Sequence, residues 1–184
     1  MHKVLEKKLF LKNKVYRVFL NKVIKNKSLT NNFLTLEVIN KYKNIGGVCC
    51  LIIKNNQIGL MLIFNPMINK KYFSIIQGFL EKKETPINSI QREIEEETGL
   101  ILDKSQINVL CSFYPFPSLI DTKMISYTTL VDKKTLYNKK LIRDEIGMNK
   151  IKFYKKERVL ELMKNINHFD MISYVVLSYF FFQK

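Results

Sequence analysis

The sequence predicts an α/β fold with one core, and three observations support this prediction. The chain has 184 residues, 47% of them hydrophobic, which suffices for one well-buried core and is too little for two full enzymatic domains. Continuous apolar runs such as 48–53 (VCCLII) are typical of buried strands. An amphipathic segment with clear start and end residues follows at 86–98, so a helix is expected to pack on those strands.

The first part of the chain predicts antiparallel strands ahead of the main domain. Segments 14–24 (KVYRVFLNKVI) and 33–39 (FLTLEVI) are rich in β-branched and aromatic residues, and apolar residues alternate in the second. A polar stretch, NKSLTNN, joins them. We expect residues 1–40 to form this antiparallel lead-in and residues 41–184 to form the main domain.

Three further strands are predicted before the helix. Residues 48–53 and 58–64 are apolar almost throughout, and a polar KNNQ turn separates them, which is typical of two buried neighbouring strands. Within the first of them, Cys49 and Cys50 should point to opposite faces as small core residues. Residues 72–77 (YFSIIQ) form the third predicted strand.

The helix expected at 86–98 has recognisable ends. Thr85 offers a hydroxyl cap, and Pro86 stands where its missing N–H costs nothing. Gly99 marks the end of the helix. Between them, three isoleucines share the face that is expected to pack on the sheet, namely Ile87, Ile90 and Ile94.

Three glutamates form a stripe beside that apolar face. Glu96 and Glu97 lie three and four positions after Glu93, so both are its neighbours on the helix surface. Their repulsion destabilises the helix by a few tenths of a kcal/mol per pair, in a chain whose formal net charge is +15. A bound divalent cation would offset that cost. Carboxylate oxygens suit Mg²⁺ or Mn²⁺.

The segment 78–100, GFLEKKETPINSIQREIEEETGL, resembles the Nudix box, G-x5-E-x7-R-E-U-x-E-E-x-G-U with U aliphatic. The resemblance implies a Nudix α/β/α sandwich with a mixed central sheet, with the box helix on one side and the C-terminal helix on the other. It also implies a Mg²⁺- or Mn²⁺-dependent hydrolase of nucleoside diphosphates linked to another moiety. The matching positions are Gly78, Glu84, Arg92, Glu93, Ile94, Glu96, Glu97, Gly99 and Leu100.

The resemblance implies that the acidic box residues bind the metal. Glu93 and Glu97 would be direct ligands, and Glu96 would be a further ligand or the base that deprotonates the attacking water. The backbone carbonyl of Gln77 would add another ligand where the strand enters the loop. A metal there would neutralise the pyrophosphate and acidify its bound water.

The remaining box residues would shape the site. By the same resemblance, Arg92 would orient the glutamates through charge-assisted hydrogen bonds, and Glu84 would brace the loop. Gly78 and Gly99 would supply backbone freedom.

Two later strands are predicted at 107–114 and 124–131. The sequence of the loop between them gives a clue to the substrate. Its YPFPSL run resembles the WPFPxSLM motif of NADH pyrophosphatases, with tyrosine in place of tryptophan and no spacer residue before the serine. That resemblance implies Tyr114, Phe116 and Ser118 as substrate-binding residues. A stiff turn between two strands is the alternative interpretation.

ADP-ribose pyrophosphatases offer a second comparison. Their N-terminal strands precede the Nudix domain in the same way, they carry a proline-containing loop in the same place, and they are commonly dimers. Lys70 or Lys71 would then replace the arginine that those enzymes present near the phosphates. ADP-ribose and NAD(H)-type dinucleotides are therefore the expected substrates, and a homodimer is a state to test.

The last part of the chain predicts a strand at 151–154, a helix from about Lys156 and a final helix at 171–181. Ahead of them, Asp144 and Glu145 resemble the acidic loop residues that complete the metal site in both subfamilies. Glu145 is the preferred candidate because it precedes the apolar strand. A solvent-exposed loop acid is the alternative interpretation.

Charge and cysteine content bound the partners and the compartment. A net charge of +15 attracts polyanions, so an RNA 5′-end pyrophosphohydrolase or a non-catalytic nucleic-acid-binding Nudix module is the alternative function, although a lysine-rich composition explains the same charge. Three cysteines without a CxxC pair argue against a disulfide framework and favour a reducing cytoplasm. No apolar run approaches the roughly 20 residues that span a bilayer. We therefore expect no membrane association.

Overall fold

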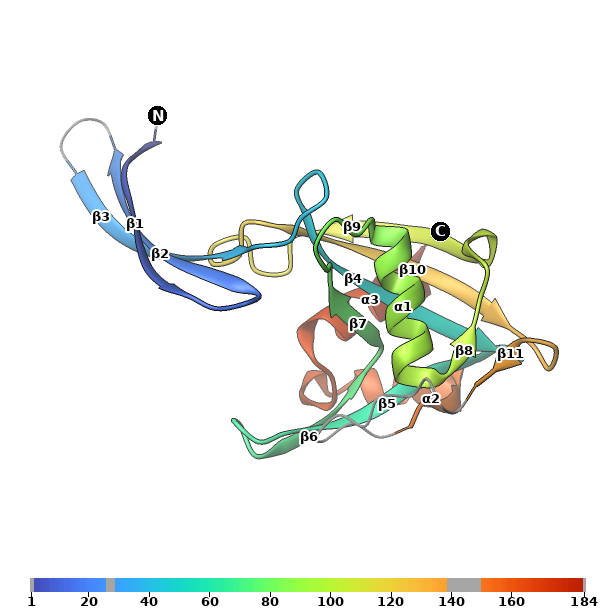
Figure 1. Cartoon of the computed structure of the whole chain (residues 1–184). Helices are drawn as coiled ribbons and strands as arrows, with labels where there is room; N and C mark the ends of the chain where they lie inside the picture. The colour runs from blue at the N-terminus through green and yellow to red at the C-terminus, as the bar shows by residue number, and fades with distance from the viewer. Residues whose placement is uncertain (1, 26–28, 139–149, 184) are drawn as a thin grey trace.

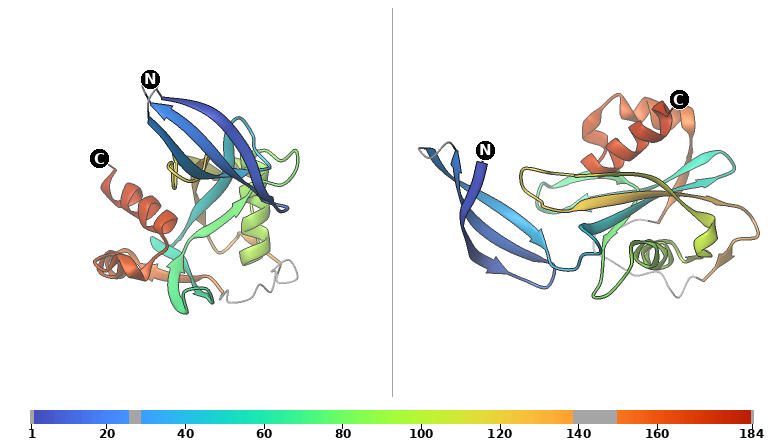
Figure 2. Two further views of the ribbon diagram at one scale, coloured as in Figure 1. Left: turned by 90° about the vertical axis from the view of Figure 1, so that its left-hand side faces the viewer. Right: turned by 90° about the horizontal axis from the view of Figure 1, so that it is seen from above.

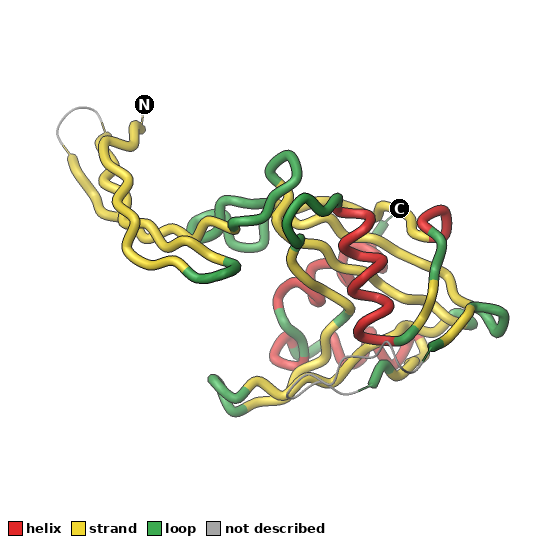
Figure 3. The backbone as a smooth tube through the Cα atoms, viewed as in Figure 1, coloured by secondary structure: helices red, strands yellow, loops and turns green. Residues whose placement is uncertain are grey.

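The computed structural model describes residues 2–25, 29–138 and 150–183. A mixed central sheet lies between helices, and a separate three-stranded sheet at the N-terminus stands to one side of this body (Figure 1). All the elements that precede the first helix are strands (Figure 3). The predicted α/β class and its mixed sheet are confirmed.

The N-terminal sheet has the strand order β1-β2-β3 and is antiparallel throughout. The strands β2 and β3 correspond to the two predicted segments. The strand β1 was not predicted, because charged residues interrupt any apolar alternation in its sequence. Its pairing with β2 shifts register between Val4 and Glu6 and again between Leu9 and Leu11. The strands are β1 (His2–Lys12), β2 (Tyr16–Lys25) and β3 (Leu29–Val38).

The central sheet has the order β12-β5-β4-β10-β9, with β6 paired to β5 and β7 paired to β4. The strands β4 and β10 run parallel, and the other paired strands run antiparallel. A further short pair, β8 with β11, lies at the edge of this body. The strands are β4 (Ile45–Lys54), β5 (Gln57–Asn65), β6 (Lys70–Ser74), β7 (Ile76–Phe79), β8 (Leu100–Ile101), β9 (Ile107–Phe113), β10 (Lys123–Val131), β11 (Leu136–Tyr137) and β12 (Lys152–Lys155).

The single strand predicted at 72–77 is instead two strands with different partners. The chain leaves β5 after Ser74 and joins β4 from Ile76, so the change occurs at Ile75. The backbone N–H of Ile75 donates to the hydroxyl of Ser173 over 3.0 Å, which satisfies a donor that no strand partner accepts at this point. The change of partner brings β7 beside β4, at the start of the Nudix box.

Helices cover both faces of the central sheet, as Figure 2 shows from above. The helix α1 (Pro86–Thr98) lies on one face, and α2 (Lys156–Met163) and α3 (Met171–Phe182) lie on the other. The short 3-10 turns are η1 (Lys104–Gln106) and η3 (Ile166–His168). The predicted α/β/α sandwich is therefore confirmed. None of the helices in the described ranges is long and apolar enough to cross a membrane.

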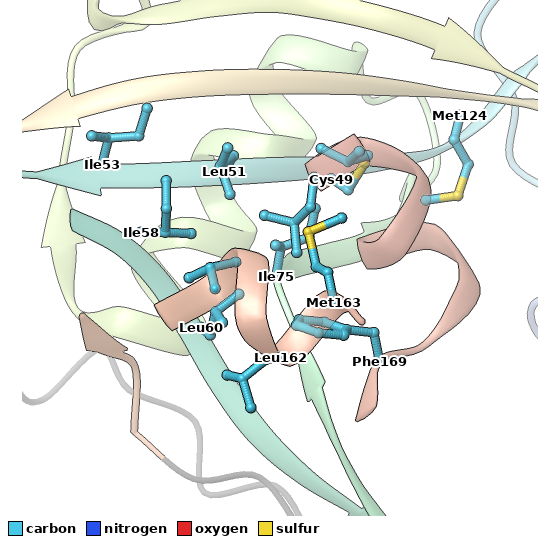
Figure 4. Close-up of a cluster of buried hydrophobic side chains, with 13 residues drawn as sticks. Cys49, Leu51, Ile53, Ile58, Leu60, Ile75, Met124, Leu162, Met163 and Phe169 are labelled. Carbon is cyan, nitrogen blue, oxygen red and sulfur yellow. The ribbon is translucent and has the colours of Figure 1, made fainter. Parts of the chain in front are cut away.

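Two apolar clusters hold the layers together, one on each face of the sheet. Cys49 belongs to the cluster beneath α2 and α3, and Cys50 belongs to the cluster beneath α1, as the alternation along β4 predicts. Figure 4 shows the first cluster, in which Phe169, Leu162 and Met163 pack against side chains of the sheet. The second cluster buries Ile90 and Ile94 completely, so the apolar stripe of α1 fixes which way its glutamates face.

Candidate active site

The strand β7 leads through the loop at 80–85 into α1. Thr85 occupies the cap position in an extended conformation, but its side chain makes no capping hydrogen bond with the described residues. Gly99 ends the helix with a φ of 74°, and its N–H donates to the carbonyl of Glu95 over 2.8 Å. A side chain is strained in that left-handed conformation, so Gly99 is needed for its backbone freedom.

Gly78 is needed for space rather than for backbone freedom. Its φ is not positive, unlike that of Gly99. A Cβ atom at Gly78 would stand 2.0 Å from Oε1 of Glu93, far inside van der Waals contact. The carboxylate of Glu93 therefore lies directly over the backbone of β7, where a larger residue would displace it.

Arg92 is the centre of an ion-pair network within the box. Its Nε and Nη2 donate to the two carboxylate oxygens of Glu84 over 3.0 and 3.1 Å, a bidentate pairing. Its Nη1 donates to Glu93 over 2.7 Å and to Glu96 over 3.1 Å. Its Nη2 also donates to the backbone carbonyl of Phe79 over 3.1 Å. One guanidinium thus joins the loop, the strand end and two of the helix glutamates.

The charges in this network reinforce one another. Burial alone would lower the pKa of Arg92, but the hydrogen bonds and charges of Glu84 and Glu93 outweigh burial and raise that pKa. Burial alone would raise the pKa of Glu84, but hydrogen bonds from Arg92 and from the backbone N–H of Glu81 outweigh it and lower that pKa. Arg92 and Glu84 therefore both stay charged at neutral pH.

Glu84 also holds the loop itself. Its Oε2 accepts a hydrogen bond from the backbone N–H of Glu81 over 2.8 Å, and its own N–H donates to the carbonyl of Glu81 over 3.2 Å. Between them, Lys83 has a φ of 63°, a conformation that a side chain adopts only when its surroundings impose it. The contacts of Glu84 close the loop on both sides of this turn.

A cavity of about 490 Å³ opens beside these residues, within the range of small-molecule sites. One side is formed by the box. The other side comes from the N-terminal sheet, through the turn between β1 and β2 and the end of β3. The box side includes Gln77, Gly78, Glu93 and Glu97, and the N-terminal side includes Lys14, Val15, Val38 and Asn40.

The structure brings only part of the predicted site to this cavity. Glu93, Glu97, Gln77 and Arg92 line it, whereas Glu96 does not and is bonded to Arg92 instead. The acids Asp144 and Glu145 lie outside the described residues.

The five residues predicted to bind substrate do not line this cavity. Tyr114 lies in the loop between β9 and β10, where its hydroxyl accepts a hydrogen bond from the side chain of Asn44 over 3.2 Å. Phe116 and Ser118 belong to the same exposed loop, while Lys70 and Lys71 begin β6. The cavity takes a lysine from the N-terminal sheet instead, namely Lys14.

The carboxylates at the cavity suit part of a magnesium site. Glu93 and Glu97 are one helical turn apart and line the same cavity. Within residues 2–25, 29–138 and 150–183, no three acidic, histidine or cysteine side chains are grouped in a way that could hold a metal. Mg²⁺ does not need such a group, since it is commonly bound by one or two carboxylates, waters and substrate phosphates. The oxygen donors present therefore fit this ion.

The N-terminal side of the cavity is the part that sequence reasoning missed. Lys14 lies in the turn between β1 and β2, where a lysine is ordinarily a solvent-exposed residue. Nothing in its neighbourhood along the chain links it to the box. The contact becomes visible only when the N-terminal sheet is placed against β7.

Comparison with known proteins agrees with this architecture. Among the solved structures that the chain resembles is one described as the crystal structure of ADP compounds hydrolase, with a TM-score of 0.74 and 12% sequence identity over 97% of this chain and 91% of the other. At that identity the likeness shows the fold alone. A search of curated proteins found no match. The NUDIX domain family matches residues 43–174, which is well over half of the chain. The protein therefore belongs to the Nudix family.

Proposed function

We propose that this protein is a Mg²⁺-dependent hydrolase that cleaves the pyrophosphate of a nucleoside diphosphate linked to another moiety. One observation carries the proposal. Two carboxylates, Glu93 and Glu97, line one cavity, and Arg92 anchors the first of them over 2.7 Å. Family membership implies the same class of reaction. Such a reaction needs oxygen donors for a cation beside a space large enough for a nucleotide, and this cavity has both.

In the proposed reaction, Glu93 and Glu97 would hold the ion, with the backbone carbonyl of Gln77 as a further ligand. The ion would neutralise charge on the pyrophosphate oxygens. Arg92 keeps Glu93 in place, and its bond to Glu96 draws that carboxylate toward the same network. A water attacking phosphorus must lose a proton to a carboxylate within reach of the cavity. Glu97 lines the cavity and Glu96 does not, so we assign this proton acceptance to Glu97.

Among possible substrates, we propose ADP-ribose or an NAD(H)-type dinucleotide. The loop resemblance noted above and the fold shared with an ADP compounds hydrolase support this choice. The test is incubation with Mg²⁺ and a panel of ADP-ribose, NADH, nucleoside triphosphates and 5′-triphosphorylated or NAD-capped RNA, with chromatography of the nucleotide products. We expect the monophosphate products of ADP-ribose or NADH, and none in the presence of a chelator.

A function directed at RNA is the alternative that the same panel separates. Its support is the net charge of +15 and two lysines that stand over exposed tyrosine rings, Lys43 over Tyr42 and Lys123 over Tyr114. Such pairs can stack on unpaired bases. Cleavage confined to the RNA substrates, with binding that weakens steeply as salt rises, would contradict the dinucleotide assignment.

We also propose that the chain forms a homodimer through its N-terminal sheet. A three-stranded sheet with many exposed apolar side chains is normally covered by another layer. The outer edge of β1 has no strand partner among the described residues, so a second copy can pair there or cover a face. The exposed apolar residues of this sheet are Val4, Leu5, Leu9, Phe10, Leu11, Leu20, Phe33 and Leu34.

Light scattering coupled to gel filtration tests the dimer. We expect the wild type to elute with the mass of two chains and the double variant Phe10→Lys/Leu34→Lys to elute as one. Leu130→Lys is the matched control, because Leu130 is 72% exposed but belongs to β10 in the central sheet. A wild type that elutes as a single chain at micromolar concentration would contradict the proposal.

A further inference from the structure

The turn between β1 and β2 places a positive charge at the proposed active site. Lys14 lines the cavity together with Glu93 and Glu97, although it belongs to the N-terminal sheet. Its side chain is exposed and makes no hydrogen bond or ion pair with any other described residue. Among the described residues that line the cavity, the other cation is Arg92, which is already engaged by three carboxylates. Lys14 is therefore the cation available to an incoming anion.

Local contacts hold this turn in a defined shape. The side-chain oxygen of Asn13 accepts hydrogen bonds from the backbone N–H groups of Val15 over 2.8 Å and Tyr16 over 2.6 Å. The N–H of Asn13 in turn donates to the carbonyl of Tyr16 over 2.9 Å. Such a turn restricts the backbone on both sides of Lys14. The lysine thus projects from a closed turn and not from a loose loop.

Further contacts fasten the turn to the body of the protein. The N–H of Ile39, just after β3, donates to the carbonyl of Val15 over 2.9 Å. The ring of Tyr16 meets the ring of Phe79 edge to face, with centroids 5.4 Å apart. Phe79 follows Gly78 in β7, so this ring pair joins the turn to the strand that carries Gln77, whose carbonyl is one of the proposed metal ligands. The N-terminal sheet is therefore a wall of the site.

We propose that Lys14 binds a phosphate group of the substrate, and that the N-terminal sheet is in this way part of the active site. This inference rests on the proposed function for the identity of the substrate as a nucleoside diphosphate derivative. The carboxylates attract a cation, whereas Lys14 attracts the phosphate oxygens that such a cation leaves uncovered. Lys14 is a substrate-binding residue here, so its removal should affect substrate affinity far more than the rate of the bound complex.

The experiment compares Lys14→Met with Lys12→Met in the full chain. Lys12 is also exposed and is the last residue of β1, but it does not line the cavity. Calorimetry with ADP in the presence of Mg²⁺ should show roughly tenfold weaker binding for Lys14→Met, the loss expected for one exposed charge-assisted contact. Lys12→Met should bind as the wild type does. Lys14→Arg should recover most of the affinity, since it keeps the charge.

The affinity for Mn²⁺ distinguishes a phosphate-binding role of Lys14 from a purely structural one, since a structural defect should weaken the binding of both ligands. Removing a cation beside the carboxylates should leave Mn²⁺ affinity, measured by electron paramagnetic resonance, unchanged or tighter while ADP affinity falls. Equal weakening of both ligands, unchanged ADP binding in Lys14→Met, or an equal loss in Lys12→Met would overturn the proposal. If the wild type binds ADP but hydrolyses no substrate, the proposed function fails while the role of Lys14 is still measured.

Discussion

Replacing Glu97 by glutamine is expected to lower Mg²⁺-dependent turnover by about 10²–10⁴-fold, the range for loss of an acid–base carboxylate. Glu97 lines the cavity one turn from Glu93, so it is placed both to hold the ion and to accept the proton of the attacking water. Glutamine keeps the size of the side chain and removes its charge. The measurement is kcat with ADP-ribose at saturating Mg²⁺, together with Mn²⁺ affinity.

Glu95→Gln is the control for this substitution. It makes the same change in charge on the same helix, but Glu95 lies outside the metal-binding positions of the box and does not line the cavity. We expect it to retain turnover within a few-fold of the wild type. Equal activity of Glu97→Gln and the wild type, with both proteins folded, would remove the basis for hydrolysis at this cavity.

The second large effect is expected from a single methyl group. In Gly78→Ala, the added carbon would stand 2.0 Å from Oε1 of Glu93, so that carboxylate must move away from β7. It would then lose its 2.7 Å contact with Arg92 and its position at the cavity. A displacement of about 1 Å in a catalytic group can cost about 10²-fold in rate. We expect a loss of kcat/KM of that order.

Stability should change much less than activity in this variant, because the displaced atoms are the far end of a flexible side chain. Thermal unfolding measures this part of the prediction. Gly47→Ala is the control, since Gly47 lies on the adjacent strand β4 and its added carbon would meet Cε and Cγ of Met124 at 3.2 Å and the Gly78 carbonyl at an ordinary 3.4 Å, with no atom of Glu93 among its three nearest. A Gly78→Ala protein with full activity would show that the position of Glu93 does not matter.

Local signals explain why the box helix could be predicted from the sequence. Pro86 and Gly99 bound α1 in the structure as they do in the sequence, and each acts through its own backbone. The apolar stripe that includes Ile90 and Ile94 then determines which face is buried. Because these causes lie within a few residues of their effects, a single sequence contains them. The predicted capping hydrogen bond from the hydroxyl of Thr85 is not formed with the described residues.

Strand pairing depends on residues that are far apart in the sequence, so the strands were predicted less completely than the helix. The segment 72–77 has the residues of one strand, yet β6 and β7 pair with different neighbours and the change falls at Ile75. Which strand lies beside which depends on the whole sheet. The first strand was missed for another reason: residues 4–12 of β1 are all exposed, so charged residues occupy it without a regular alternation.

The candidate site also has a part that the local sequence predicts and a part that depends on tertiary packing. Residues within the box have a fixed spacing on one loop and one helix, so the contacts of Arg92 with Glu84 and Glu93 follow from a motif. Lys14 lies at the cavity because the turn is packed against the body, through contacts such as that of Tyr16 with Phe79, which no local pattern encodes. The roles proposed for Tyr114, Phe116 and Ser118 came from a resemblance and stay predictions. So does the role of Glu145.

The parallel pairing of β4 with β10 has a consequence for how this chain is made. Strands β1 to β3 pair with their neighbours in sequence and can form as they leave the ribosome, whereas β4 obtains its parallel partner only when Val131 has been synthesised. A translation product that stops after α1 would contain the whole acidic motif but leave one edge of β4 bare. Such an edge pairs readily with other chains. Chains whose translation stops after α1 should therefore aggregate.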